Sequence, residues 1–179
     1  MNKNLTIHIA KDEYGKDLVI DLTNTKSLLI GGCTGSGKSV LLHKIVGTLI
    51  TNNSPELLKL ILIDPKRVEL NTYDKIPHML TPVIFETRKA ILAMKWVIKE
   101  ISRRLDILKG ENSRNISEYK GKEGMPSILV VIDELSDIMV QYPKEAEPVI
   151  SKIAEIGDIV GVYILLATSR PSSKILTKD

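Results

Sequence analysis

The chain has 179 residues, 43% of them hydrophobic, which is enough to bury the core of one domain of ordinary size. No stretch approaches the roughly 18 uninterrupted apolar residues of a membrane span, and the first residues lack a signal peptide's apolar run, so we expect a soluble, cytoplasmic domain. The single cysteine excludes an internal disulfide and makes redox chemistry a poor fit.

The net charge of +3 is unevenly distributed along the chain. Residues 86–124 hold ten Lys/Arg against six Asp/Glu, a local excess of +4. Such an excess is compatible with a polyanionic partner such as nucleic acid. It is equally compatible with an ordinary solvated helix face, and charge alone leaves both interpretations open.

Short apolar runs alternate with longer segments of helical period, a pattern typical of βαβ units around a mainly parallel sheet. The elements expected in the first half are strands at 6–9 and 18–22 joined by a turn at Gly15, a strand at 27–30, a helix at 38–51 and a strand at 58–63. The two leading strands predict an N-terminal β-hairpin. A Gly-rich loop fills the space between the third strand and the first helix.

The second half continues the alternation. The clearest helix is 87–109, whose apolar residues step by three and four and form one stripe, namely Ile91, Met94, Ile98, Ile101, Leu105 and Leu108. We expect Trp96 to lie in the core with them. The elements that follow are a polar surface loop at 110–124 with a short helix around 115–119, a buried strand at 128–132, a helix at 144–156 and a strand at 162–167.

The Gly-rich loop matches the P-loop pattern at every specified position and predicts a nucleoside triphosphate site, with ATP and Mg²⁺ as ligands. Its residues are Gly32, Cys33, Thr34, Gly35, Ser36, Gly37, Lys38 and Ser39. Glycines let successive backbone N–H groups point at a phosphate, and the following helix adds the positive end of its dipole. Lys38 is expected to reach the β- and γ-phosphates and Ser39 to ligate Mg²⁺. The alternative is an ordinary Gly-rich turn.

A second signal is the pair Asp133 and Glu134, which follows the apolar strand 128–132 directly. Charges at the end of a buried strand are costly unless they have partners or a role. In P-loop proteins the Asp that organises Mg²⁺ lies here, so we assign Asp133 to the metal and Glu134 to activation of the attacking water. The alternative is that both residues merely cap the next helix.

Polar residues also end the last strand, where Thr168, Ser169 and Arg170 follow residues 162–167. Ser169 is a candidate for contact with the γ-phosphate or its water, although a turn or capping role is the simpler interpretation of Thr168 and Ser169. Cys33 is expected to be passive. The three histidines show no metal-ligand spacing.

Seven motifs in order make the sequence resemble the FtsK/SpoIIIE-type double-stranded DNA translocases, within the wider FtsK and HerA group of P-loop ATPases. They are GGCTGSGKSV (31–40), LILIDPKRVEL (60–70), IPHMLTPV (76–83), the Trp96 helix with Glu100, Arg103 and Arg104, RNISEY (114–119), VVIDELSDIM (130–139) and LLATSRPS (165–172).

The resemblance implies a RecA-like motor fold and a Mg²⁺-dependent ATPase that moves duplex DNA as a ring, a hexamer by analogy, in a process such as chromosome segregation. It also implies that an arginine from a neighbouring subunit completes the ATP site. The candidates in this chain are Arg67, Arg103, Arg104, Arg114 and Arg170. For non-specific DNA phosphate contacts the candidates are Lys109, Arg114, Lys120 and Lys122, which cluster in or beside the polar loop.

The sequence departs from the family pattern in two places. Ser169 stands where the family usually has Gln, and Asp158 stands where a positive charge is typical. Family motors also carry further strands after the last motif, so residues 1–179 are interpreted as a single motor domain that is either truncated at its C-terminus or a minimal relative.

Two rival functions remain open from sequence. One is an ATP-binding switch or assembly module that does not translocate DNA, which Ser169 and Asp158 make credible. The other is a different P-loop enzyme, a GTPase or a small-molecule kinase, but the N-K-x-D guanine pattern and an Arg-rich lid are both absent from the sequence.

Overall fold

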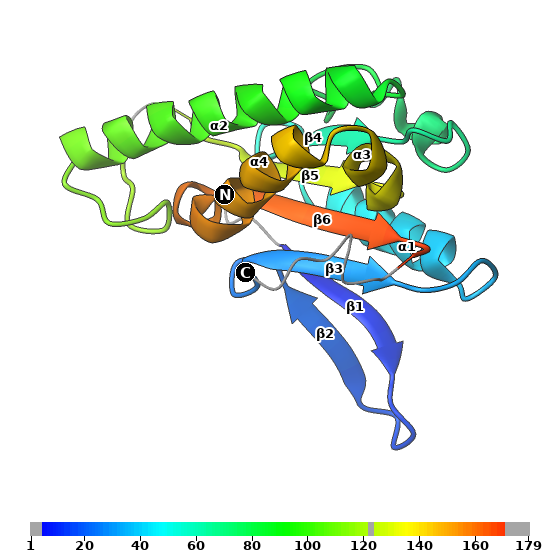
Figure 1. Ribbon diagram of the computed structural model, residues 1–179. Helices are drawn as coiled ribbons and strands as arrows, with labels where there is room; N and C mark the ends of the chain where they lie inside the picture. Colours follow the sequence, from blue (N-terminus) through cyan, green and yellow to red (C-terminus); the bar gives the residue numbers. More distant parts are fainter. Residues whose placement is uncertain (1–4, 122–123, 171–179) are drawn as a thin grey trace.

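The computed structural model describes residues 5–121 and 124–170 and is built on a four-stranded parallel sheet (Figure 1). The sheet has the order β3-β6-β5-β4 and consists of β3 (Ser27–Gly31), β4 (Leu58–Ile63), β5 (Ser127–Ile132) and β6 (Val162–Thr168). An antiparallel hairpin precedes it, formed by β1 (Thr6–Lys11) and β2 (Asp17–Asp21). The predicted fold class, a mainly parallel sheet with an N-terminal hairpin, is confirmed.

Helices cover both faces of the sheet, as Figure 1 shows. They are α1 (Lys38–Asn52), α2 (Thr87–Gly110), α3 (Leu135–Gln141) and α4 (Pro143–Ile156), with two short 3₁₀ segments, η1 (Leu70–Tyr73) and η2 (Asp158–Val160). One core lies between the sheet and α2, α3 and α4, and the other lies between the sheet, α1 and the hairpin. Alternate residues of each central strand point into the two cores, as the pleat of a strand requires.

The parallel arrangement brings the carboxyl ends of the strands to one edge. Gly31 at the end of β3 lies opposite Thr168 at the end of β6, and Ile63 of β4 lies opposite Ile132 of β5. All six residues of β5 are buried, so this strand is the rigid centre from which the chain emerges at Asp133. In open parallel sheets ligands bind outside this edge.

Two expectations about local structure were wrong, and one helix was not predicted. Residues 115–118 form a bend and a turn in place of the short helix: the Asn115 side chain closes the turn by accepting the N–H groups of Ser117 and Glu118, and the N–H of Ile116 bonds the distant carbonyl of Ile159. Helix α3 was not expected, since its residues follow Glu134 without a recognisable start signal. Trp96 is 46% exposed, because it lies two positions from buried Met94 and therefore on the opposite side of α2.

Arg104 of α2 is a buried structural cation. Its side chain is 2% exposed and donates to Glu100 Oε1 at 2.8 Å and to the carbonyls of Pro126 and Val160 at 2.8 and 3.0 Å. Those bonds tie the helix to the loops that precede β5 and β6.

Replacing Arg104 with Ala is expected to lower the free energy of unfolding by about 2 kcal/mol or more, because buried acceptors lose their donor. Arg103→Ala is the matched control, since Arg103 bonds the same Glu100 from a side chain that is 47% exposed. Thermal and urea unfolding of both variants measure the difference, and equal losses would contradict the assigned role of Arg104.

Within residues 5–121 and 124–170, no helix has the length and apolar character needed to cross a lipid bilayer.

Candidate active site

The loop between β3 and α1 has the conformation of a phosphate cradle. Gly35 and Gly37 have φ values of 83° and 89°, in the left-handed region that side chains disfavour. Helix α1 begins at Lys38 with no side-chain cap and no acidic residue in its first turn. Its N–H groups and the positive end of its dipole are therefore available to an anion.

Lys38 lies against Asp133 at the centre of the site. The Nζ atom donates to Asp133 Oδ1 at 2.6 Å, and the two side chains are 12% and 3% exposed. Burial raises the pKa of Asp133 above its ordinary value, an effect that the hydrogen bond from Lys38 opposes. Lys38 is thus paired with the carboxylate that follows β5.

Glu134 is held by a cage of donors. Its Oε1 accepts from Ser136 Oγ at 2.6 Å, Thr168 Oγ1 at 3.1 Å and the Ser169 N–H at 3.0 Å, while Oε2 accepts from Lys66 Nζ at 2.7 Å and from Ser169 Oγ. Burial opposes the ionised form, but the bonds from Lys66, Ser136 and Ser169 outweigh it and hold the Glu134 pKa well below its ordinary value. The carboxylate is therefore ionised.

The backbone at Glu134 is strained, with φ 64° and ψ 69° in the left-handed region. Such conformations cost free energy and persist where the surroundings enforce them, most often at functional sites. The side chain does not cap α3, so the capping alternative for Glu134 is not what the structure shows. The turn aims the carboxylate across the end of β6 toward Ser169.

Two further side chains join the site from the segment after β4. Lys66 bonds Glu134 as described, is 47% exposed, and has a pKa raised chiefly by that hydrogen bond. Glu69 Oε1 accepts a hydrogen bond from Ser39 Oγ at 2.6 Å. Neither residue was assigned a role from sequence, although both lie in the DPKRVEL motif. Their positions depend on a loop conformation that spacing does not reveal.

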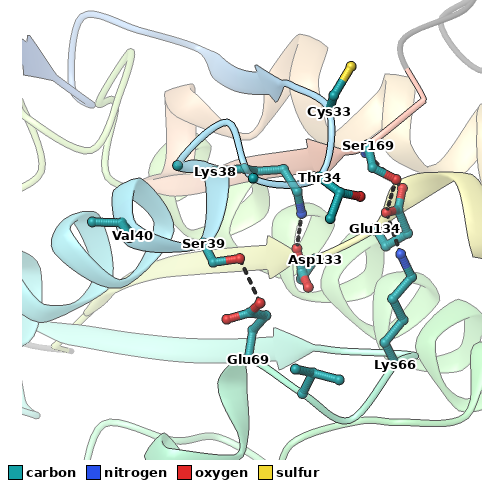
Figure 2. Close-up of a pocket in the computed structure, with 13 residues that line it drawn as sticks. Cys33, Thr34, Lys38, Ser39, Val40, Lys66, Glu69, Asp133, Glu134 and Ser169 are labelled. Atoms are coloured by element: carbon teal, nitrogen blue, oxygen red, sulfur yellow. Dashed lines mark hydrogen bonds and ion pairs between the residues drawn. The ribbon is translucent and has the colours of Figure 1, made fainter.

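These groups line one pocket of about 380 Å³, a volume suited to a small ligand (Figure 2). Its walls include Lys38, Ser39, Lys66, Glu69, Asp133, Glu134 and Ser169. Figure 2 shows Lys38 directed toward Asp133 and Lys66 directed toward Glu134, with the Cys33 side chain directed away from both pairs. The passive role expected for the exposed Cys33 stays a prediction.

The oxygen donors present suit Mg²⁺ held mainly by a nucleotide. In the part of the chain that the structure describes, no three His, Cys, Asp or Glu side chains converge as a ready-made metal cage. Mg²⁺ at phosphate sites uses one or two protein oxygens, together with substrate phosphates and water. Ser39 and Asp133 both face the pocket and supply oxygens of this kind. Their chemistry fits the ion.

The candidate DNA-binding residues lie elsewhere. Lys109, Arg114 and Lys120 are exposed near the C-terminal end of α2, beside the segment that leads into the start of β6. The phosphate loop is at the opposite edge of the sheet, where β6 ends. Lys122 lies outside the described residues.

The arginines considered as donors to a neighbouring site differ in their surroundings. Arg104 is buried in its own fold, Arg103 bonds Glu100, and the guanidinium of Arg67 stacks 5.1 Å from the centre of the Phe85 ring. Arg114 and Arg170 are exposed. Burial removes Arg104 from the set of candidates.

Comparisons with known proteins agree with this geometry. The sequence model of the FtsK/SpoIIIE family matches residues 1–125. A DNA translocase FtsK from Clostridium tetani is 43% identical over 98% of this chain and 25% of its own length, and one from Helicobacter pylori is 42% identical over 97% and 21%. The chain thus spans about a quarter of the length of these curated relatives.

Solved structures show the same fold. The cytoplasmic domain of the type VII secretion ATPase EccC from Thermomonospora curvata matches with a TM-score of 0.84 and 27% identity over 98% of this chain and 22% of its own. The pCW3 conjugation coupling protein TcpA, solved with ATPγS, matches with a TM-score of 0.79 and 24% identity over 99% of this chain and 52% of its own.

Proposed function

This chain belongs to the FtsK/SpoIIIE family of P-loop ATPases, and from that premise we propose that residues 1–179 form an ATP-hydrolysing motor domain that translocates double-stranded DNA. The motor acts in the cytoplasm as a ring, a hexamer, in a process such as chromosome segregation. The observation that carries the proposal is one pocket shared by the phosphate-binding loop, Asp133 and Glu134.

Binding of ATP exchanges partners within the pocket. In this structure each lysine is neutralised by a carboxylate, Lys38 by Asp133 and Lys66 by Glu134. A triphosphate entering the cleft competes for both ammonium groups, because it carries more negative charge and more acceptor oxygens than a single carboxylate does. Lys38 then holds the β- and γ-phosphates, while Ser39 and Asp133 are left to hold Mg²⁺, which supplies charge neutralisation at the phosphates.

Hydrolysis requires a water placed in line with the γ-phosphate. Glu134 accepts a proton from that water as the water oxygen bonds to the γ-phosphorus. The bond between the γ-phosphorus and the oxygen of the β-phosphate breaks, and ADP leaves. Ser169 bonds Glu134 through both its N–H and its hydroxyl, so its proposed role is to orient the carboxylate. When Lys66 binds the phosphate, Glu134 loses one hydrogen-bond donor. Its carboxylate pKa then rises, and Glu134 becomes a stronger base.

Contact with DNA is proposed to be non-specific and made to phosphates. Lys109, Arg114 and Lys120, with Lys122, are the proposed contacts, and an exposed arginine such as Arg114 or Arg170 is the proposed donor to the neighbouring subunit's ATP site. Because such contacts release counterions, DNA affinity falls steeply as salt rises.

The test is the ATPase rate with and without duplex DNA across a salt series, with assembly followed by mass in solution. We expect DNA to stimulate turnover at low salt and the stimulation to disappear as salt rises. Lys109→Ala combined with Lys120→Ala should lower the DNA affinity and leave the basal rate intact. A ring that hydrolyses ATP and ignores DNA at every salt concentration would overturn translocation. Nucleotide binding without turnover would instead favour the rival function, a non-translocating switch or assembly module.

A further inference from the structure

Glu69 is the third carboxylate of the pocket, and the proposed hydrolysis gives it no task. It does not pair with either lysine in this structure. Its Oε1 accepts a hydrogen bond from Ser39 Oγ at 2.6 Å, and its side chain is 25% exposed. A carboxylate on a pocket wall, bonded to the hydroxyl proposed to ligate Mg²⁺, needs an explanation.

The direction of this hydrogen bond decides what it can do. A serine hydroxyl has one proton to donate and two lone pairs. A carboxylate oxygen accepts, so the Ser39 hydroxyl donates its one hydrogen bond to Glu69 and keeps its lone pairs for another partner. The contact therefore prepares Ser39 to ligate a cation and need not break when the cation arrives.

Glu69 is itself fixed from two sides. Its backbone N–H and that of Leu70 donate to Asp64 Oδ2 at 2.9 and 3.0 Å, and Asp64 is fully buried at the end of β4. These bonds anchor the start of η1 to the sheet. The other Asp64 oxygen has no hydrogen-bond partner among the described residues.

The second support comes from α1. His43 lies one helical turn after Ser39 on the same face, and its Nε2 is 3.4 Å from Glu69 Oε2. Its Nδ1 is 2.9 Å from the hydroxyl of Tyr73, the last residue of η1. The hydrogen bond between His43 and Tyr73 ties the imidazole ring to η1 and so fixes it beside Glu69.

We propose that Glu69 is a positioning residue for Mg²⁺: it accepts a hydrogen bond from the Ser39 hydroxyl, fixes that hydroxyl with its lone pairs toward the metal, and is itself held by the bonds to Asp64 and flanked by His43. This inference rests on the proposed Mg-ATP site. Groups that bind metal ligands in this way orient the ligand and strengthen it as a donor. Glu69 acts through Ser39 and does not touch the substrate.

The experiment measures how strongly Mg²⁺ and nucleotide favour each other. Affinity for ATPγS is determined by calorimetry in saturating Mg²⁺ and in EDTA. The coupling is the dissociation constant in EDTA divided by the dissociation constant in Mg²⁺, so a larger ratio means that Mg²⁺ strengthens nucleotide binding more. Glu69→Ala is expected to lower that ratio by about 10- to 100-fold through the Mg²⁺ arm alone, with the EDTA affinity unchanged. Glu69→Gln keeps an acceptor without the charge and should fall between wild type and Ala. It also serves if the Ala variant does not fold.

Two controls separate the possible outcomes. Glu155→Ala removes an exposed carboxylate of α4 and should leave the ratio as in wild type. In a Ser39→Ala background, Glu69→Ala should have no further effect, since the residue acts through the serine hydroxyl.

Three results would overturn the inference: a coupling ratio that Glu69→Ala leaves unchanged, a ratio that it raises, or an undiminished effect without Ser39. A raised ratio would mean that the Ser39–Glu69 bond blocks the metal. Wild-type protein that binds no ATPγS under either condition would instead overturn the proposed function itself.

Discussion

Replacing Glu134 with Gln is expected to lower ATP turnover by about 10²- to 10⁴-fold while nucleotide binding survives. The amide has nearly the size of the carboxylate but cannot accept the proton of the attacking water. Lys38 and the phosphate loop do not depend on Glu134, since their bonds run to Asp133 and along α1. The variant should therefore trap the ATP-bound state.

The measurement pairs a steady-state ATPase assay with calorimetric binding of ATPγS. Glu155→Gln on the exposed face of α4 is the matched control and should retain the wild-type rate. The ionised form of Glu134 is stabilised in the fold, so its contribution to stability is present above its ordinary pKa and is lost as pH falls below it. Assays near neutral pH avoid that loss. Turnover within threefold of wild type would remove Glu134 from the reaction.

Replacing Lys38 with Ala is expected to weaken ATPγS binding by about 2–5 kcal/mol, which is roughly 30-fold or more in the dissociation constant. The phosphates lose the ammonium group of Lys38, and Lys66 does not replace it because it already makes its own proposed contact with the triphosphate.

The cost to folding should be smaller than the cost to binding. Asp133 loses its cation, but burial already raises its pKa and thereby favours the uncharged carboxyl, which limits the cost of the lost partner. Calorimetry measures the loss of affinity and thermal unfolding measures stability, with exposed Lys152→Ala as control. A folded Lys38→Ala protein that binds ATPγS as wild type does would contradict the role given to the loop.

The sequence was informative where chemistry is local. The phosphate loop is eight consecutive residues, and Asp133 and Glu134 directly follow an apolar strand, so their types and order were enough to nominate them. Parallel strands then had to bring the two segments together at one edge, and the register of β3, β6 and β5 does so. Their assignment to binding and hydrolysis stays a prediction.

The sequence was not informative where a role depends on how a loop folds. Lys66 and Glu69 lie two and five positions after Asp64, and no periodicity shows that one reaches Glu134 and the other Ser39. Both positions are set by the turn in which Asp64 accepts N–H groups further along the chain. Buried acceptors of this kind are found only once tertiary structure is known.

The helix predicted at 115–119 was wrong for a related reason. At 115–119 the local sequence permits a helix, but the N–H of Ile116 donates to the carbonyl of Ile159, a partner distant in the chain. Ser169 was nominated for contact with the γ-phosphate or its water, which stays a prediction. The structure shows the N–H and the hydroxyl of Ser169 bonded to Glu134.

The position of β3 at the edge of the sheet has a consequence for local opening at the site. Among the described strands, β3 pairs with β6 alone, whereas β5, which carries Asp133 and Glu134, is enclosed on both sides. Local opening costs least where the fewest backbone pairs must separate. The loop proposed to bind phosphate therefore follows an edge strand, whereas Asp133 and Glu134, proposed for metal binding and hydrolysis, follow a strand that is paired on both sides. A triphosphate bound at the proposed site would contact both segments, and we expect it to resist the separation of β3 from β6.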